Sequence, residues 1–199
     1  DPKSIITYAK ALEGKTISLV CEPEVSENQY GGKGNFGQLL EKYYFGYEVN
    51  SVSAPDFEEA GIELKSTPLR TLKNGVMKSK ERLVLGIINY LDIVDEDFET
   101  SALFTKNKHL LLVFYLWSKE LDELSYPIKI VGDWQFPEED LAIIRSDWET
   151  IQDKIKNGKA HELSEGDTLY LGAATKGSTA AKSLRDQPNN TIKAKHLSY

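Results

Sequence analysis

The longest apolar run of the sequence places the tightest constraint on the fold. It covers eight residues, Leu110–Trp117, and shows none of the polar alternation of a strand that faces water. A strand of this kind must be covered on both faces, as in the middle of a layered sheet. The run is also far shorter than the roughly 20 residues needed to cross a bilayer. We therefore expect a central buried strand over 109–115 and no membrane segment.

Helices and further strands are predicted around this central strand. Apolar residues recur at helical spacing over 35–45 and 137–157, and Ile62 and Leu64 alternate with charged residues as in a strand. After a turn signal, residues 82–90 are rich in branched side chains and are predicted to form the return strand. A chain of 199 residues suits one domain, or one domain with two lobes. We expect an α/β (α+β) fold in which helices flank a mixed central sheet.

Two glycines, Gly34 and Gly37, lie at the start of the helix predicted over 35–45. Glycine is a poor helix former, so each needs a reason. The missing Cβ would allow the backbone to approach a phosphate closely. A flexible helix start explains the two glycines equally well.

The strand around Leu64 carries a charged face. Residues two apart on a strand share a face, so Glu63 and Lys65 point together, and Ile62 and Leu64 point into the core. A bend after Asp56 can bring this acid beside Glu63. Two neighbouring carboxylates repel each other unless a cation joins them, and Mg²⁺ prefers such oxygen ligands. With a lysine beside them, they form the groups needed for metal-dependent phosphodiester hydrolysis, although a plain salt-bridged strand edge fits the triplet equally well.

Longer blocks of sequence carry a resemblance. Pro55-Asp56 followed by Glu63-Leu64-Lys65 resembles the PD…(D/E)xK signature of restriction-endonuclease-like proteins. Four further blocks resemble the MutH family of GATC endonucleases: KGNFGQLLEKYYFG (33–46), SAPDFEEAGIELKSTPL (53–69), FETS (98–101) with Lys106, and TKGSTAAKSLR (175–185). Three others are similar to the Sau-type branch of this family: KERLVLGIINY (80–90), GKAHELSEG (158–166) and TIKAKH (191–196). The resemblance spans nearly the whole chain. It implies a restriction-endonuclease-like fold whose two lobes form a DNA cleft, with 1–199 as a single catalytic domain from a longer chain.

The resemblance also assigns roles at the catalytic centre. Asp56 and Glu63 would hold Mg²⁺ together with the backbone carbonyl of Leu64, and Lys65 would be the catalytic lysine. The remaining catalytic positions implied are Glu41 and Lys106. The longer chain of a Sau-type enzyme would add a second MutH-like domain.

DNA contacts are implied for a second set of residues. These are Lys33, Lys176, Gly177, Glu81 and Tyr199. A lysine on the loop of Lys176 can donate to base edges in the major groove, which is the usual basis of direct readout. Mismatch-repair members have an Arg-Pro pair where this chain has Ala-Thr before Lys176, so the mode of base contact is open.

The net charge of −7 does not exclude a nucleic-acid partner, because the charge is unevenly spread. Residues 65–82 hold six cations and one acid, and residues 172–199 hold five cations and one acid. Phosphate binding needs only such a local basic surface. The single cysteine, Cys21, excludes an internal disulfide and suits a reducing compartment, so we expect a cytoplasmic protein.

The leading functional hypothesis is a Mg²⁺-dependent type II restriction endonuclease that hydrolyses double-stranded DNA at 5′-GATC-3′. One alternative is a MutH-like mismatch-repair enzyme that nicks GATC sites with activating partners. The other is a non-catalytic GATC-binding module, against which the intact set of two acids and a lysine argues. The sequence leaves the oligomeric state open.

Overall fold

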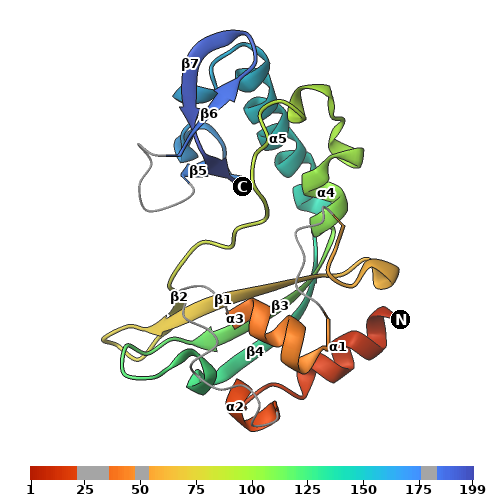
Figure 1. Ribbon diagram of the computed structural model, residues 1–199, viewed down its shortest axis with the longest axis vertical. Helices are drawn as coiled ribbons and strands as arrows, with labels where there is room; N and C mark the ends of the chain where they lie inside the picture. Colours follow the sequence, from red (N-terminus) through yellow and green to blue (C-terminus); the bar gives the residue numbers. More distant parts are fainter. Residues whose placement is uncertain (22–35, 48–53, 176–182) are drawn as a thin grey trace. The chain divides into compact units, whose positions relative to one another are not determined.

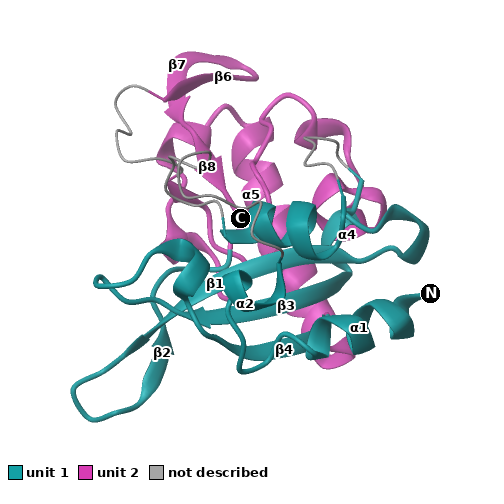
Figure 2. Cartoon of the chain, turned by 60° about the horizontal axis from the view of Figure 1, so that its bottom comes forward, with its two compact units in different colours: residues 1–83, 106–135 teal, residues 84–105, 136–199 magenta. Residues whose placement is uncertain are grey.

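The computed structural model describes residues 1–21, 36–47, 54–175 and 183–199. The chain divides into two compact units, shown in different colours in Figure 2. Unit 1 contains 1–83 and 106–135, and unit 2 contains 84–105 and 136–199. The chain therefore passes from unit 1 to unit 2, returns, and passes to unit 2 again.

Unit 1 is built on a four-stranded mixed sheet (Figure 1). Its strands are β1 (Glu63–Thr71), β2 (Met77–Ser79), β3 (His109–Leu116) and β4 (Ile128–Gln135), in the order β2-β1-β3-β4. β1 and β3 run parallel, with Glu63 opposite Leu110, and the other pairs are antiparallel. The predicted central strand is confirmed, because β3 lies between two neighbours and Leu110, Leu111 and Val113 are fully buried.

Short helices cover one face of this sheet (Figure 1). They are α1 (Pro2–Lys10), α2 (Ile17–Val20), α3 (Phe36–Leu39) and a π-helix (Leu40–Tyr44) that continues α3. Their apolar side chains share one core with Leu64, Leu111 and Val113. The free edge of β4 is also occupied, since Val131 N–H donates to the Glu13 carboxylate at 2.8 Å and its carbonyl accepts from Lys10. Short 3₁₀ turns at Glu58–Ala60 and Glu123–Ser125 complete this unit.

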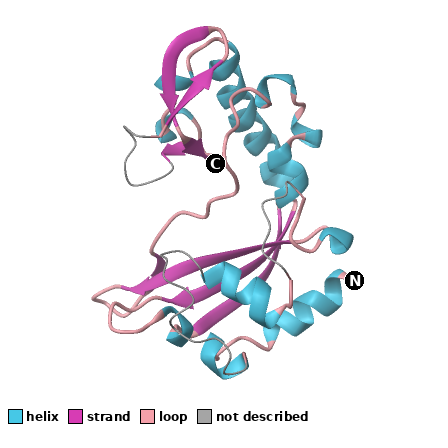
Figure 3. Ribbon diagram, in the orientation of Figure 1, coloured by secondary structure: helices cyan, strands magenta, loops and turns pink. Residues whose placement is uncertain are grey.

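Unit 2 is built around one long helix (Figure 3). α5 (Leu141–Lys156) buries Trp148, Ile151 and Ile155 in a second core. Two short strand pairs accompany it, β5 (Ala174–Thr175) with β8 (Leu197–Ser198), and β6 (Leu184–Gln187) with β7 (Asn190–Lys195). The other elements are α4 (Ala102–Asn107), whose last two residues belong to unit 1, and 3₁₀ turns at Ile93–Asp95, Phe98–Thr100, Glu138–Asp140, Ala160–Glu162 and Glu165–Asp167.

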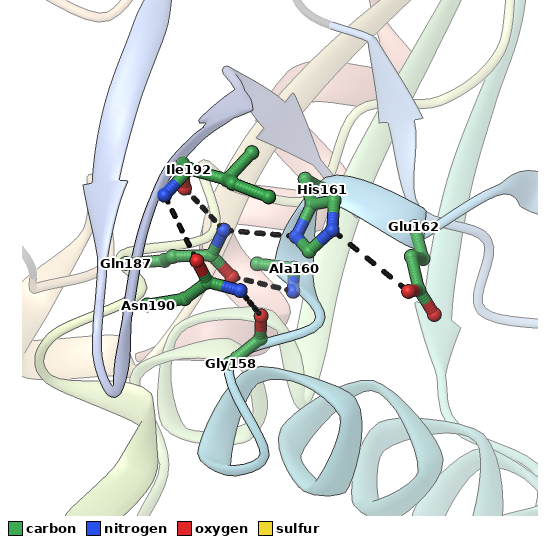
Figure 4. A network of polar contacts seen from close by, with 7 residues as sticks. All are labelled: Gly158, Ala160, His161, Glu162, Gln187, Asn190 and Ile192. Carbon is green, nitrogen blue, oxygen red and sulfur yellow. Dashed lines mark hydrogen bonds and ion pairs between the residues drawn. The ribbon is translucent and has the colours of Figure 1, made fainter.

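A buried amide fastens the β6–β7 hairpin within unit 2 (Figure 4). The Gln187 carbonyl oxygen accepts from Ala160 N–H at 2.8 Å, and its amide nitrogen lies 2.5 Å from the Ile192 carbonyl oxygen. The same nitrogen donates to His161 Nδ1 at 3.0 Å, which requires Nδ1 to be an acceptor. Asn190 adds a bond to the Gly158 carbonyl just beyond the end of α5. A buried polar side chain is tolerated here because its hydrogen bonds are satisfied.

The prediction of a return strand over 82–90 is wrong. The antiparallel partner of β1 is β2. Residues 82–90 form no strand, and their one β-bridge joins Ile87 to Ser198, beside backbone hydrogen bonds to Leu197 and Tyr199. Two of these residues serve packing instead, since Ile88 and Tyr90 are buried in the core of unit 2. The mixed α+β class with helices flanking a mixed sheet is confirmed. In the described part of the chain no helix is both long and apolar enough to span a membrane.

Candidate active site

The first residues of β1 separate a core face from a charged face. Ile62 and Leu64 are buried in the core of unit 1, as predicted. The ammonium of Lys65 lies 2.8 Å from Glu63 Oε1, so the two charged residues share the opposite face. The side chain of Glu63 is buried, with only 3% of the residue exposed, which is unusual because glutamate is rarely buried unless it is paired.

A tight turn brings Asp56 beside this pair. Phe57 bridges to Ile62, and Gly61 closes the turn with φ +64°, a backbone conformation that favours glycine. The backbone N–H of Asp56 donates to Glu63 Oε2 at 3.2 Å, and the Leu64 N–H donates to Asp56 Oδ2 at 2.9 Å. The bend predicted between the two acids is thus present, and reciprocal hydrogen bonds fix it.

Lys106 approaches the same carboxylate from another part of the chain. It occupies the last turn of α4, and its Nζ lies 3.6 Å from Glu63 Oε1. The Oε1 atom therefore faces two ammonium groups, those of Lys65 and Lys106. Both side chains are largely buried, so these charges interact more strongly than surface pairs do.

Glu41 joins the site from the π-helix, a feature that is frequent at functional sites. Burial, followed by the charges of Asp56 and Glu63, raises the pKa of Glu41 to about 7. Burial and the charge of Glu63 likewise raise the pKa of Asp56 to about 6. Burial and the repulsion between these neighbouring acids therefore favour the protonated forms of Glu41 and Asp56 when no cation is present.

The donor set suits a hard divalent cation. The carboxylate oxygens of Asp56 and Glu63, which hydrogen bonds hold beside each other, are of the ligand type of Mg²⁺, which retains several waters. Across the described residues, no group of three or more His, Cys, Asp or Glu side chains could hold a metal ion.

The residues implied to contact DNA are more scattered. Lys33, Lys176 and Gly177, like Gly34, lie outside the described residues. Glu81 is exposed and pairs with Lys80, whose ammonium also lies 4.8 Å from the centre of the Trp117 ring.

Tyr199 packs against the core of unit 2. Burial raises the pKa of its phenol. Its backbone N–H donates to the Gly86 carbonyl at 2.9 Å, and its carbonyl accepts from Leu85 N–H at 3.0 Å. Its contact with bases stays a prediction.

The sequence gives no signal for one neighbour of the site, Ser66. Its hydroxyl lies against the backbone of α3, where a Cβ on Gly37 would be 3.1 Å from Ser66 Oγ. Serine directly after the lysine of a strand is unremarkable in a pattern search. The proximity becomes visible only when α3 is packed on β1.

A carboxylate and a lysine at the start of a strand in a mixed sheet, joined by a carboxylate from the preceding turn and a lysine from a helix, are consistent with the restriction-endonuclease-like class. Comparisons with known proteins agree. The family described as "DNA mismatch repair enzyme MutH" matches residues 45–147. The chain belongs to the MutH family.

Individual relatives cover most of the chain. The type II restriction enzyme Sau3AI of Staphylococcus aureus is 44% identical over 199 residues, which cover 99% of this chain and 40% of that enzyme. The DNA mismatch repair protein MutH of Shewanella woodyi is 32% identical over 85% of this chain and 75% of its own length. MutH of Vibrio campbellii is 30% identical over 94% of this chain and 84% of its own length. The chain thus spans about 40% of the length of Sau3AI but most of the length of these MutH proteins.

Proposed function

We propose that this chain is the catalytic domain of a Mg²⁺-dependent type II restriction endonuclease that hydrolyses double-stranded DNA at 5′-GATC-3′. The observation that carries the proposal is the convergence of Asp56, Glu63, Lys65 and Lys106 on one buried point of unit 1. The 44% identity to a type II restriction enzyme over 99% of the chain supports the choice of activity. A salt-bridged strand edge would not need three acids with only two lysines between them.

The side chains divide the work of hydrolysis. Mg²⁺, when bound, supplies Lewis acidity to a phosphoryl oxygen and to a water. Asp56, Glu63 and the Leu64 carbonyl would hold the ion. The ammonium of Lys65, fixed by its bond to Glu63, would orient the attacking water and the scissile phosphate.

Two further groups would handle charge and protons. Lys106 would stabilise the negative charge that develops on the phosphate as water attacks and the P–O bond breaks. Glu41, whose pKa is about 7, can accept or release a proton near neutral pH.

The partner and setting belong to the same proposal. The duplex would be contacted by Lys33, Lys176, Gly177, Glu81 and Tyr199, with 1–199 acting as one catalytic domain. A second MutH-like domain would lie in the remainder of a longer chain. We propose a cytoplasmic location, which the single cysteine supports.

The other candidate activity is nicking of GATC sites in mismatch repair. The family match and the coverage of two MutH relatives favour it. The identity to Sau3AI over the whole chain favours restriction cleavage instead.

Digestion of matched duplexes tests the proposal. A duplex with one GATC site should be cut with Mg²⁺ and remain intact with EDTA, and a duplex without GATC should remain intact in both. Lys65→Ala should abolish cutting, and Lys129→Ala, on the exposed side of β4, should not. Cutting by Lys65→Ala at the normal rate would refute the catalytic assignment.

Methylation states separate the two activities. Cleavage of both strands of an unmethylated duplex without added proteins would support the restriction activity. Nicking of hemimethylated sites that depends on partner proteins would support the repair activity.

A further inference from the structure

We propose that the missing Cβ of Gly37, which lets the helix lie close to Ser66 of β1, positions Glu41 at the catalytic centre, so that Gly37 is a positioning residue for the cleavage reaction. The inference rests on the proposed nuclease function. It assigns a role to a glycine that the sequence connects only with phosphate approach or helix flexibility.

The contact is direct and tight. A Cβ on Gly37 would lie 3.1 Å from Ser66 Oγ and 4.0 Å from Ser66 Cβ. A separation of 3.1 Å is shorter than ordinary van der Waals contact, so either the hydroxyl or the helix would have to move. The same Cβ would lie 4.0 Å from Glu41 Oε1, which places the carboxylate of Glu41 beside the contact.

The helix has little freedom to tilt away. Phe36 and Leu39, on either side of Gly37 in α3, are each 2% exposed and belong to the core of unit 1. The ring of Phe36 also stacks on Tyr115 of β3, with 3.9 Å between the ring centres. Displacement of α3 would disturb a well-packed core, so the close approach to β1 is a fixed feature of the unit.

This contact sets the distance between the helix and the catalytic strand. Ser66 follows Lys65 on β1, and Glu41 lies four residues after Gly37, in the π-helix that continues α3. Because the core holds α3 in place, a side chain at position 37 would force a local shift of a few tenths of an ångström at this contact, and that shift would change the position of Glu41 relative to Asp56 and Glu63. Small displacements of catalytic groups are costly because the reaction depends on their geometry.

A double-mutant cycle tests the contact through the sign of the change in melting temperature that Gly37→Ala causes with and without the Ser66 hydroxyl. Alanine normally favours a helix more than glycine does, so Gly37→Ala should raise the melting temperature where space is available. In the wild-type background the new methyl meets Ser66 Oγ, and we expect a lower melting temperature. In the Ser66→Ala background the hydroxyl is gone, and the same substitution should be neutral or stabilising.

Cleavage rates provide the functional readout. With excess protein, Mg²⁺ and a duplex containing one GATC site, Gly37→Ala should cut at least tenfold more slowly than wild type and bind the duplex within twofold. Ser66→Ala should cut within threefold of wild type, and the double variant Gly37→Ala/Ser66→Ala should return to within threefold. Gly132→Ala is the matched control, since its Cβ would meet Leu112 at an ordinary 3.6 Å.

A second variant covers the case in which Gly37→Ala does not fold. Ser66→Thr adds a methyl from the strand side of the contact, where β-branched residues are well tolerated. It should reproduce the loss of rate while the protein stays folded.

The outcomes separate this inference from the proposed function. Wild-type rates for both Gly37→Ala and Ser66→Thr would overturn the inference, as would a slow Gly37→Ala variant that Ser66→Ala does not rescue. A wild-type protein that cuts no GATC duplex would refute the proposed function instead, and the melting temperatures would still test the contact.

Discussion

The buried carboxylate of Asp147 in unit 2 and the carboxylates around Glu63 in unit 1 have different hydrogen-bonding and charged neighbours. In unit 2, Asp147 is 7% exposed and accepts N–H bonds from Leu169, Tyr170 and Leu171 at 3.0, 2.6 and 2.9 Å. In unit 1, Glu63 is equally buried, but its neighbours include the carboxylates of Asp56 and Glu41. Burial of an acid alone therefore does not indicate a reactive site. The difference lies in whether its neighbours are backbone donors or other acids.

The largest expected effect concerns activity and comes from unit 1. Glu63→Gln removes a proposed metal ligand and the charge that fixes Lys65, so the cleavage rate should fall at least about 10³-fold. Single-turnover digestion of a GATC duplex measures it. Glu149→Gln, exposed on α5, should keep the wild-type rate. Similar cleavage rates in both variants would show that Glu63, like Asp147, has no role in the reaction and only stabilises the fold.

The next effect concerns stability and comes from unit 2. Asp147→Asn leaves at least one backbone N–H facing an amide NH₂ group in a buried place. We expect a loss of roughly 2–4 kcal/mol in the free energy of unfolding, measured by urea titration. Asp153→Asn, exposed on the same helix, should change it by less than about 0.5 kcal/mol. Equal losses would mean that the three bonds to Asp147 contribute little.

A pH dependence should distinguish the two groups further. The folded-state pKa values of Glu41 and Asp56, about 7 and about 6, lie above their ordinary values, so the folded metal-free protein binds more protons than the unfolded chain. Their stabilising contribution is complete below about pH 4 and is lost as the pH rises to about 7. The melting temperature of metal-free protein should fall over this range. Glu41→Gln should make this fall in melting temperature smaller. An unchanged fall would contradict the raised pKa of Glu41.

The smallest effect is expected at a surface acid of unit 2. The ammonium of Lys154, 2.7 Å away, and then the Ser164 N–H lower the pKa of Asp167. Lys154→Gln should move this pKa toward its ordinary value, as NMR titration would detect. The cost in stability should be only about 0.2–1 kcal/mol, because the pair is partly open to solvent and such pairs contribute little. A larger loss would mean that this ion pair contributes to the free energy of unfolding as strongly as buried Asp147 does.

The periodic parts of the fold were predictable because local patterns determine them. The alternation around Leu64 correctly placed Ile62 in the core and Glu63 beside Lys65. The run ending near 157 predicted α5, and Gly158 ends it with φ +68°.

The one wrong strand, and the two site residues that only the resemblance named, have the same physical explanation. Residues 82–90 have strand composition, yet Ile88 and Tyr90 are used for packing in unit 2, which no local pattern reveals. Likewise, only the folded chain brings Lys106 to Glu63, and no spacing rule predicts the π-helix that carries Glu41. Tertiary packing decides these cases, and it is not encoded in short windows of sequence.

The path of the chain between its units has a consequence for folding during synthesis. β1 has its parallel neighbour in β3, and residues 84–105, which belong to unit 2, must be made before β3 exists. The catalytic strand therefore leaves the ribosome with its inner edge unpaired, and pairing must wait for a distant segment. Such non-local pairing slows folding and exposes strand edges to aggregation. We expect that neither unit can be excised as a continuous piece, and that the proposed catalytic centre forms late, when both passes through unit 1 are complete.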